Sequence, residues 1–319
     1  MSGHTLSAVM PNYNHGHYLA EAILGMAEQS RPPDELVILD DASTDDSVRV
    51  IESLLGRFPF LRLIRHDRNQ GVSAALERLL AEARGDYLFC AAADDVRLPG
   101  FFERAMAMAA QHPEAGVIFG NVRLIDEAGR HLGLFGAQQW PEPLYASPRR
   151  FLEEYLMREV PSQSLSSGTI YRTDALRELG GYRPELGSWT DTFAIHAIGL
   201  KYGVGYLACE VARVRMLAAS YSNQTVAQPH KLLDIIARAA HLMRSPEFRD
   251  RFPERYVRRW SRSYRYRVVR DFFLGAEPQG RRRPPFVVRN LRRLPRLWAA
   301  LRLWCYQGDV SCYDRSGGR

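Results

Sequence analysis

The chain has 319 residues, 46% hydrophobic and 25% charged, a composition that excludes a disordered, collagenous or low-complexity protein. Its net charge of +7 is unevenly distributed: residues 244–319 hold 20 arginines against 7 acidic residues, a net +13, whereas residues 1–243 carry a net −6. A slightly acidic body is therefore followed by a strongly basic C-terminal region.

The four cysteines form no CxxC pair, and the chain is long enough to bury a sizeable core, so we expect neither a disulfide framework nor a structural zinc site. No apolar run reaches the roughly 18 residues of a membrane-spanning helix. A strand-like run begins at Leu6, which leaves no room for a signal peptide. A cytoplasmic location is the resulting expectation.

Residues 1–125 alternate short apolar runs with helical patterns. The apolar runs predict strands at 6–10, 35–40, 61–65, 86–90 and 116–125, and the helical patterns predict helices at 18–29, 43–55, 72–83 and 99–111. The run Ser43-Thr-Asp-Asp46 predicts a capping box with Ser43 as the N-cap. Regular alternation predicts a mostly parallel sheet flanked by helices, in which ligands bind beyond the carboxyl ends of the strands.

The pattern is less regular after residue 125. Helices are predicted at 173–179 and 191–202, and extended segments at 162–171 (after a polar start) and 204–215. From Val226 onward the chain is expected to be helical, with breaks near 245–246, at 275–285 and at Pro295.

The loops after the first two predicted strands carry polar and aromatic side chains. Pro11-Asn-Tyr-Asn14 follows the first strand, where Tyr13 can stack on a planar base or, equally, pack at the sheet edge. Asp40-Asp41 follows the second strand. A helix dipole accounts for one of these carboxylates, and the second can accept hydrogen bonds from a base N–H or a ribose hydroxyl.

Asp94 and Asp95 follow the fourth strand, after three small residues that allow a bulky ligand to approach. Two adjacent carboxylates at one strand end are costly unless they are neutralised, and Mg²⁺ or Mn²⁺ prefers such oxygen ligands. The alternative is a solvated turn before the helix that starts near Pro99.

Taken together, these motifs resemble family-2 glycosyltransferases, whose nucleotide-binding domain has the A-type glycosyltransferase fold. The resemblance covers residues 6–125 and continues more loosely to about 225. It is carried by Pro11-Asn-Tyr-Asn, Val-Ile-Leu-Asp-Asp-Ala-Ser (37–43), Asn-Gln-Gly-Val-Ser-Ala-Ala (69–75), Ala-Arg-Gly-Asp-Tyr-Leu (83–88) and Ala-Ala-Asp-Asp-Val (92–96) with Pro99. It implies an inverting enzyme that moves a sugar from a nucleotide-diphosphate sugar, UDP- or dTDP-linked, to a hydroxyl of a glycan or lipid-linked acceptor in bacterial surface polysaccharide synthesis.

The resemblance also implies residue roles. Tyr13 would stack near the nucleobase and Asp41 would contact its N–H, Asp94 would lie near the ribose, and Asp95 would ligate a divalent cation, Mn²⁺ or Mg²⁺, at the diphosphate. Pro11 and Asn14 belong to the same nucleotide site. Asp191, after Gly-Gly-Tyr-Arg (180–183), resembles the catalytic base, although a helix N-terminal dipole partner explains an acid there as well.

Three further residues are candidates for diphosphate or acceptor contacts. Ser167 lies in a small polar turn, and Trp189 can stack on a sugar or belong to the core. Arg215 ends Arg-Val-Arg, where family members often have a histidine, so it is a candidate to contact the diphosphate directly. Ala92 stands where many members have another Asp, which places more weight on Asp95 as a metal ligand.

We therefore predict a catalytic domain at 1–225, with a nucleotide-binding half (1–125) and an acceptor-binding half (126–225), followed by a helical, Arg-rich region at 226–319. Arginines and aromatic residues alternate over 255–304, which favours peripheral contact with an anionic membrane, such as the inner face of the cytoplasmic membrane, over contact with nucleic acid. A soluble helical cap is an equal alternative. The second class of function is a non-catalytic binder of nucleotide sugar, membrane or nucleic acid. A GxGxxG motif and a P-loop are both missing after the first strand, which disfavours a dinucleotide-dependent enzyme.

Overall fold

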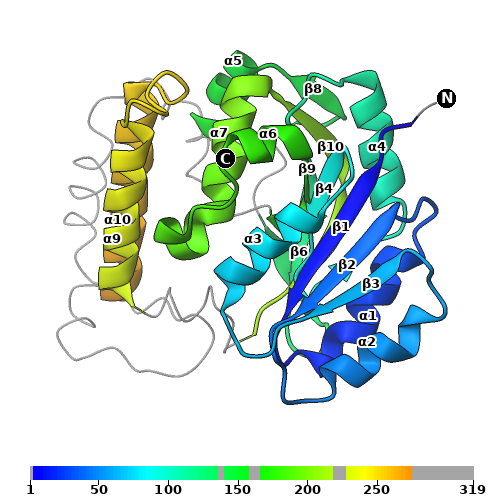
Figure 1. Ribbon diagram of the computed structural model, residues 1–319. Helices are drawn as coiled ribbons and strands as arrows, with labels where there is room; N and C mark the ends of the chain where they lie inside the picture. Colours follow the sequence, from blue (N-terminus) through cyan, green and yellow to red (C-terminus); the bar gives the residue numbers. More distant parts are fainter. Residues whose placement is uncertain (1–2, 136–139, 158–165, 218–227, 275–319) are drawn as a thin grey trace. The chain divides into compact units, whose positions relative to one another are not determined.

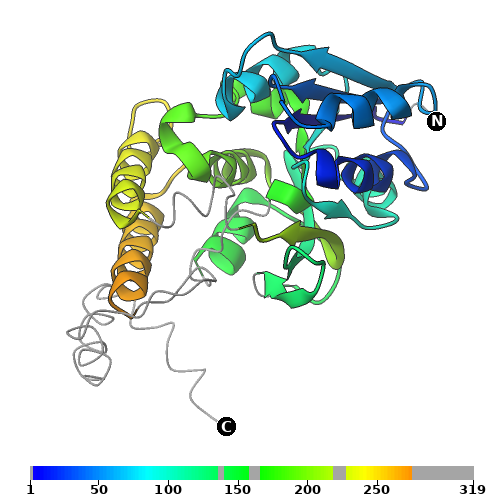
Figure 2. The same ribbon diagram turned by 90° about the horizontal axis from the view of Figure 1, so that it is seen from below.

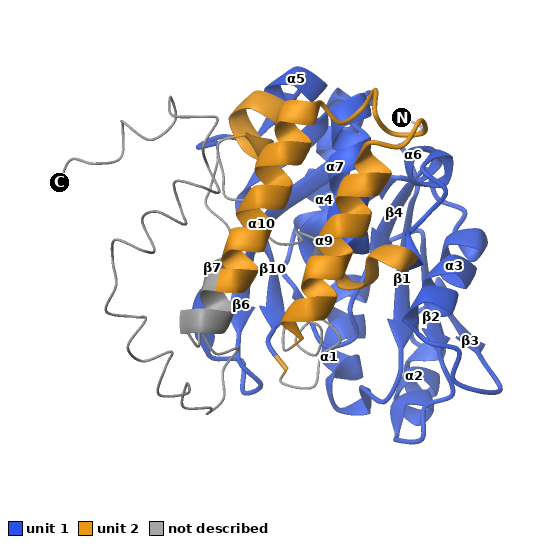
Figure 3. Ribbon diagram, turned by 90° about the vertical axis from the view of Figure 1, so that its left-hand side faces the viewer, with its two compact units in different colours: residues 1–151, 163–184, 189–216 blue, residues 152–162, 185–188, 217–319 orange. Residues whose placement is uncertain are grey.

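The computed structural model describes residues 3–135, 140–157, 166–217 and 228–274. The chain divides into two compact units. Unit 1 consists of residues 1–151, 163–184 and 189–216, and unit 2 of residues 152–162, 185–188 and 217–319 (Figure 3). Every residue of the candidate site lies in unit 1.

The first half of unit 1 is a doubly wound α/β arrangement. Its elements are β1 (Leu6–Asn12), α1 (Gly16–Ala27), β2 (Glu35–Asp40), α2 (Ser47–Leu55), β3 (Leu61–Arg65), α3 (Val72–Glu82) and β4 (Tyr87–Cys90). The four strands are parallel in the order β3-β2-β1-β4. Since the chain moves outward through β2 and β3 and then back to β4, right-handed crossovers place α1 and α2 on one face and α3 on the other (Figure 1).

The second half of unit 1 turns this sheet into a mixed one. Its strands are β5 (Val96–Arg97), β6 (Val117–Ile125), β7 (His131–Phe135), β8 (Leu144–Ala146), β9 (Thr169–Arg172) and β10 (Val204–Arg215). Its helices are α4 (Phe101–Gln111), α5 (Pro148–Arg150), η1 (Phe151–Leu156), η2 (Ser166–Gly168), α6 (Thr173–Glu178), η3 (Pro184–Trp189) and α7 (Thr190–Tyr202), of which η1 and η3 share residues with unit 2.

The strands of unit 1 form one ten-stranded sheet with the path β3-β2-β1-β4-β9-β6-β10-β5. β9 is antiparallel to both β4 and β6, whereas β10 is parallel to β6. This confirms the predicted α/β sheet flanked by helices and adds an inserted antiparallel strand. Because β9 runs the opposite way, its first residues and the preceding η2 lie at the edge where β4 ends.

The central strands are buried on both faces. Leu36, Val37, Ile38 and Leu39 of β2 have no exposed surface, as in a strand covered by helices on each side. Burial of this kind explains why the sequence of β2 is a continuous apolar run rather than an alternating one.

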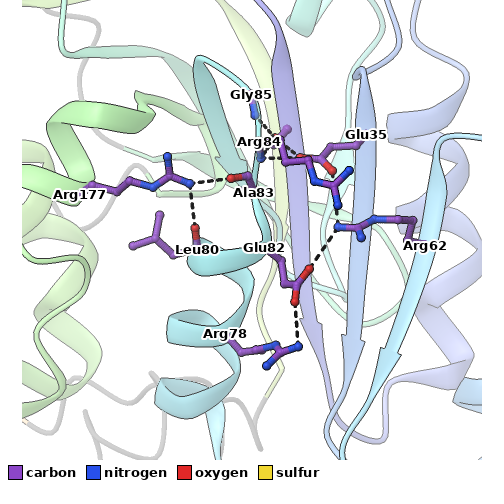
Figure 4. Close-up of polar contacts among 10 residues, drawn as sticks. Glu35, Arg62, Arg78, Leu80, Glu82, Ala83, Arg84, Gly85 and Arg177 are labelled. Atoms are coloured by element: carbon purple, nitrogen blue, oxygen red, sulfur yellow. Dashed lines mark hydrogen bonds and ion pairs between the residues drawn. The ribbon is translucent and has the colours of Figure 1, made fainter.

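The polar groups at the amino ends of the strands bind one another. Glu35 accepts a hydrogen bond from the backbone N–H of Arg84 (2.7 Å), and Arg62 lies between Glu35 (3.5 Å) and Glu82 (3.6 Å) (Figure 4). Arg177 of α6 donates to two carbonyl oxygens at the end of α3. These contacts tie α3 and α6 to the sheet. The opposite, carboxyl edge, which faces the viewer in Figure 2, carries the candidate site.

The predicted capping box is wrong. The helix begins at Ser47, and Ser43 makes no cap. The hydroxyl oxygen of Ser43 instead accepts hydrogen bonds from Asn12 Nδ2 (3.2 Å) and from the backbone N–H of Asn14 (2.9 Å). The amide of Ser47 donates to Asp45 Oδ1 (3.0 Å). Ser43 therefore binds residues of the neighbouring loop instead of capping the helix as its local spacing had predicted.

Unit 2 contains two long helices, α9 (Pro229–Met243) and α10 (Glu254–Leu274), which pack side by side (Figure 3). Ile236 and Met243 of α9 are buried, as are Tyr256, Val257 and Trp260 of α10. Glu254 pairs with Arg244 and Arg258 across the turn and along α10. None of the described helices combines the length and apolar composition needed to cross a bilayer. The basic stretch beyond residue 274 lies outside the described residues.

Candidate active site

The loops after β1 and β2 are tied together at the carboxyl edge of the sheet. Asn12 lies opposite Asp40 in the strand register, and its Nδ2 donates to Asp40 Oδ2 (2.8 Å). Asn14 has a positive φ of 56° and accepts a hydrogen bond at Oδ1 from the backbone N–H of Thr44 (2.8 Å). Asn14 thus holds the two loops in a fixed relation, and its predicted nucleotide contact stays a prediction.

Tyr13 is one of three large hydrophobic side chains that are exposed among the described residues. It has 44% of its surface accessible, whereas Pro11 is half-buried in β1 opposite Leu39. The fixed backbone on either side of Tyr13 presents its ring at the carboxyl edge. An exposed ring on a fixed loop is suited to stacking on a flat ligand.

Asp41 has 3% of its surface exposed, and both of its carboxylate oxygens have protein partners. Oδ1 contacts His66 Nδ1 (2.7 Å) and accepts from the backbone N–H of Gln70 (2.9 Å), and Oδ2 accepts from that of Gly71 (2.8 Å). Burial by itself raises the pKa of this carboxyl, but the hydrogen bonds from His66, Gln70 and Gly71 outweigh it, so the pKa lies below its usual value. Asp41 is a fixed anion that joins the end of β2 to the loop before α3.

Asp95 has the same exposed fraction, 3%, but is enclosed more deeply by the protein. Oδ2 accepts from the hydroxyl of Ser167 (2.5 Å), and Oδ1 accepts from the backbone N–H of Arg215 (2.9 Å). Burial raises the pKa of Asp95 to about 6, against the opposing charge of Arg97. The structure thus brings together Asp95, Ser167 and Arg215, which the sequence singled out separately.

Asp94 has a different exposure from its neighbour. It is half-buried, and its carboxylate makes no hydrogen bond or ion pair with a described residue; only its carbonyl oxygen is used, by Arg215 Nε (3.0 Å). Asp94 therefore has the free carboxylate of the acidic pair.

The guanidinium of Arg215 is committed to the protein. Nη2 donates to Glu21 of α1 (2.8 Å), Nη1 donates to the carbonyl of Glu127 (2.9 Å), and Cζ lies 4.7 Å from the ring centroid of Tyr18. Arg215 joins α1, the turn after β6 and the loop after β4 that holds Asp94 and Asp95, here called the acidic loop. The predicted diphosphate contact stays a prediction, and it would require Arg215 to release one of these partners.

Arg97 was not predicted as a site residue. It lies in β5, its side chain is 1% exposed, and its Nη1 lies 3.7 Å from Asp95 Oδ2. Burial lowers the pKa of its guanidinium, while the charges of Asp95 and Asp94 raise it. The available signal was an arginine two residues after an acidic pair, but a two-residue strand shows no periodicity that would have placed it.

Asp191 lies in the first turn of α7, near the end of β4. Burial, and next the negative charge of Asp191, raise the pKa of the Cys90 thiol to about 12. The same charge acts on Tyr171 and Tyr182, whose pKa values burial raises well above the usual value. Asp191 is half-buried, so a carboxylate that accepts a proton at this position is partly shielded from water.

Trp189 belongs to the core of unit 1. It is 8% exposed, and its ring contacts Phe193 (centroids 6.1 Å apart) and His196 (5.9 Å). Of the two interpretations of Trp189, these contacts favour core packing. Its stacking on a sugar stays a prediction.

The donor set at the acidic loop fits a divalent cation that also takes oxygens from a substrate. No group of three or more His, Cys, Asp or Glu side chains suited to a metal is present among the described residues. Mg²⁺ commonly binds through one or two carboxylates together with substrate phosphates, and the free carboxylate of Asp94 supplies such a ligand. A cation is therefore expected with a phosphate ligand rather than on the protein alone.

The fold is that of the A-type class of glycosyltransferases. The model of the family described as "Glycosyl transferase family 2" matches residues 7–179, more than half of the chain. The protein belongs to this family, which confirms the resemblance found in the sequence.

Relatives identified by sequence cover part of the chain. Uncharacterized protein Rv1520 of Mycobacterium tuberculosis is 37% identical over 142 residues, 44% of this chain and 41% of that protein. Putative glycosyltransferase EpsE of Bacillus subtilis is 30% identical over 187 residues, 57% of this chain and 61% of that protein. The matches thus span less than two thirds of either relative.

Solved structures share the fold over nearly the whole chain. S. aureus TarS 1–349 in complex with UDP-GlcNAc has a TM-score of 0.65 and 16% identity, over 95% of this chain and 89% of that one. The mannosyltransferase PcManGT from Pyrobaculum calidifontis, in complex with GDP-Man and Mn²⁺, has a TM-score of 0.59 and 18% identity, over 96% and 84%. At such identities the likeness shows the fold alone.

Proposed function

We propose that the protein is an inverting glycosyltransferase that moves a sugar from a nucleotide-diphosphate sugar to a hydroxyl of an acceptor. The observation that carries this proposal is the gathering, at one edge of the sheet, of an exposed ring (Tyr13), a fixed anion (Asp41) and an acidic pair (Asp94 and Asp95). Ligands of open α/β sheets bind at this edge. Membership of glycosyl transferase family 2 supports the same reaction class.

The nucleotide is proposed to bind between the loops after β1 and β2. Tyr13 stacks on the base, and Asp41 accepts a hydrogen bond from a base N–H at the lone pair left on Oδ2, which receives one protein donor. Pro11 and Asn14 shape this part of the site. A uracil or thymine ring has an N–H that suits such an acceptor, so UDP- and dTDP-sugars are the proposed donors.

A divalent cation, Mn²⁺ or Mg²⁺, is proposed at the acidic loop. When bound, it would offset the charge that develops on the leaving nucleoside diphosphate. Asp94 can accept it without losing a protein partner. Asp95, the ligand predicted from the sequence, would have to share an oxygen with Ser167 or the Arg215 amide. We therefore propose Asp94 as the first ligand.

Asp191 is proposed to be the general base. It would take the proton from the acceptor hydroxyl as that oxygen attacks the anomeric carbon, a contribution typically worth about 10²–10⁴-fold in rate. Direct attack inverts the configuration and needs no covalent nucleophile. Ser167 and Trp189 remain candidates for contacts with the donor or acceptor.

The acceptor is proposed to be a glycan or a lipid-linked glycan of bacterial surface polysaccharide synthesis, reached from the cytoplasmic side. The basic stretch 255–304 is proposed to contact an anionic membrane peripherally. In its described part, Arg255, Arg258, Arg262 and Arg265 of α10 are exposed and recur at helical spacing, though Arg255 and Arg258 also pair with acids. Nucleic acid is not a proposed partner.

Nucleotide-dependent thermal stability tests this function. We would measure Tm with UDP, dTDP and GDP, each with Mn²⁺ or with EDTA. The proposal predicts a rise with UDP or dTDP that is larger with Mn²⁺, and release of free sugar or transfer product from the matching donor. A protein that shows no response to any nucleotide, with or without cation, would contradict the proposal. Binding without turnover under every acceptor condition would favour the non-catalytic alternative.

A further inference from the structure

The guanidinium of Arg97 is buried in unit 1 without a hydrogen bond. Its Nε, Nη1 and Nη2 have no hydrogen-bond partner in the part of the chain that the structure describes, and its side chain is 1% exposed. Buried charges are ordinarily paired and hydrogen-bonded because leaving water is unfavourable for an ion. Such a group calls for a specific compensating charge.

Two contacts compensate Arg97. Its Cζ lies 4.9 Å from the ring centroid of Phe89 in β4, a cation–π contact. Its Nη1 lies 3.7 Å from Asp95 Oδ2, which is the one ion pair of Arg97 among the described residues. The arginine therefore depends on Asp95 for its counter-charge.

Asp95 is held so that it can serve as this counter-charge. Ser167 and the backbone N–H of Arg215 each bind one of its oxygens, which fixes the carboxylate beside Arg97. Asp94, one residue earlier, is half-buried, and its carboxylate has no such partner within the described ranges. Of the three charges in the loop, the buried pair cancels two, and the negative charge of Asp94 is left over.

We propose that Arg97 is the internal counter-ion of Asp95, and that the neutral Asp95–Arg97 pair supports the loop while Asp94 presents the charge that meets a divalent cation. Arg97 is thus a positioning residue. The ion pair stands on the contacts alone, whereas its link to cation binding rests on the proposed function. Two measurements on the full-length protein separate these parts.

The first measurement is a double-mutant cycle of urea unfolding in EDTA, with Arg97→Met, Asp95→Asn and the double variant. Each single variant leaves one buried charge without its partner, so the double variant is expected to be more stable than either single variant. If the double variant loses as much unfolding free energy as the two single variants together, Asp95 and Arg97 do not interact and the proposed ion pair is wrong. If Arg97→Met does not fold, the comparison of Asp95→Asn with the double variant decides alone, and a double variant that is no more stable overturns the proposal.

The second measurement is Mn²⁺ binding in the presence of UDP, followed by electron paramagnetic resonance of free Mn²⁺. Asp95→Asn leaves the Arg97 charge uncompensated beside Asp94, so Mn²⁺ affinity is expected to fall about tenfold or more. Adding Arg97→Met removes that charge and should restore affinity to within about threefold of wild type. Asp94→Asn should abolish binding in either background. A double variant as weak as Asp95→Asn would show that Asp95 is itself a ligand and would overturn the proposal.

Arg123→Met is the matched control. Arg123 pairs with Glu210 (2.8 Å) between β6 and β10 of the same sheet, with side chains 29% and 21% exposed. Its loss should leave Mn²⁺ affinity unchanged. If wild-type protein with UDP binds no Mn²⁺, the metal part of the proposed function fails together with the cation link, and the unfolding cycle still decides whether Asp95 and Arg97 are coupled.

Discussion

Asp41 and Asp95 are two carboxylates at the same edge of one sheet with equally little exposed surface, but Asp95 is enclosed more deeply by the protein, and the pKa values of the two groups shift in opposite directions. Asp41 receives two backbone N–H groups and His66, which lower its pKa. Asp95 receives one backbone N–H and one hydroxyl beside a cation 3.7 Å away, and burial raises its pKa. Close hydrogen-bond donors thus keep the less deeply enclosed Asp41 ionised, whereas the deeper burial of Asp95 raises its pKa despite the nearby cation.

This contrast separates the loop after β2 from the acidic loop after β4. In the loop after β2, hydrogen bonds hold the carboxylate of Asp41 ionised and in place, which suits recognition of one hydrogen-bond donor. The loop after β4 carries the Asp95–Arg97 pair and one further negative charge on Asp94, which suits a place where a cation and a diphosphate arrive and leave.

Asp41→Ala should cost about 3 kcal/mol in the free energy of unfolding, since the backbone amides of Gln70 and Gly71 lose their charged acceptor. The quantity to measure is the urea midpoint and slope at neutral pH. A loss below about 1 kcal/mol would mean that water replaces the carboxylate easily and that the loop is not rigid.

The pH dependence of stability should distinguish the two carboxyls. The pKa of Asp95 is raised to about 6 from a usual 3.8, so its protonated carboxyl stabilises the folded protein. This contribution to the free energy of unfolding is fully present below pH 4 and is lost as pH rises through 6. The pKa of Asp41 is lowered, so its ionised carboxylate stabilises the folded protein. This contribution to the free energy of unfolding is constant at pH values above the usual aspartate pKa and is lost only as pH falls below it. Asp95 should therefore reduce the free energy of unfolding by about 3 kcal/mol between pH 4 and 7.

Unfolding of wild type and Asp95→Asn in EDTA, at several pH values from 4 to 7, measures this contribution. The difference between the two proteins cancels the other titrating groups. An identical pH slope in both proteins would contradict the assigned surroundings of Asp95.

Ser167→Ala and Ser43→Ala form a matched pair with smaller effects. Each removes one hydroxyl, from Asp95 in the first case and from Asn12 and Asn14 in the second, at a cost of about 1 kcal/mol. Only Ser167→Ala should steepen the loss of stability between pH 4 and 7, because the pKa of Asp95 then rises further. Equal pH profiles for the two variants would argue against the Ser167 contact.

Tyr13→Ala should change stability least. The ring is 44% exposed, so the free energy of unfolding should move by less than about 0.5 kcal/mol. UDP affinity, in contrast, should fall by about 1–3 kcal/mol, the usual worth of base stacking on an aromatic ring. Unchanged UDP affinity would place the base elsewhere.

Much of the fold could be predicted from the sequence because it depends on local pattern. The strands at 35–40 and 61–65 were predicted to the residue, since continuous apolar runs bounded by polar residues are typical of buried parallel strands. The antiparallel direction of β9 could not be predicted, because it depends on pairing with strands distant in the sequence.

The site was predictable in its residue types and less so in its contacts. Loops after β1, β2 and β4 had to meet at one edge once the sheet was parallel. The partners of Asp41 and Asp95, however, come from elements distant in the chain: His66 after β3, Ser167 in η2 and Arg97 in β5. The failed capping box at Ser43 has the same cause, since a tertiary partner outweighed a local one.

The most direct test of the central claim, that the carboxyl edge of this sheet binds a nucleoside diphosphate, is titration calorimetry of UDP with Mn²⁺ against wild type and Asp41→Asn. Asn keeps the shape and one acceptor oxygen but loses the charge, so a folded variant can be compared directly. The account predicts at least about a tenfold loss of UDP affinity, the worth of one charged hydrogen bond. A folded Asp41→Asn protein that binds UDP as tightly as wild type would contradict it.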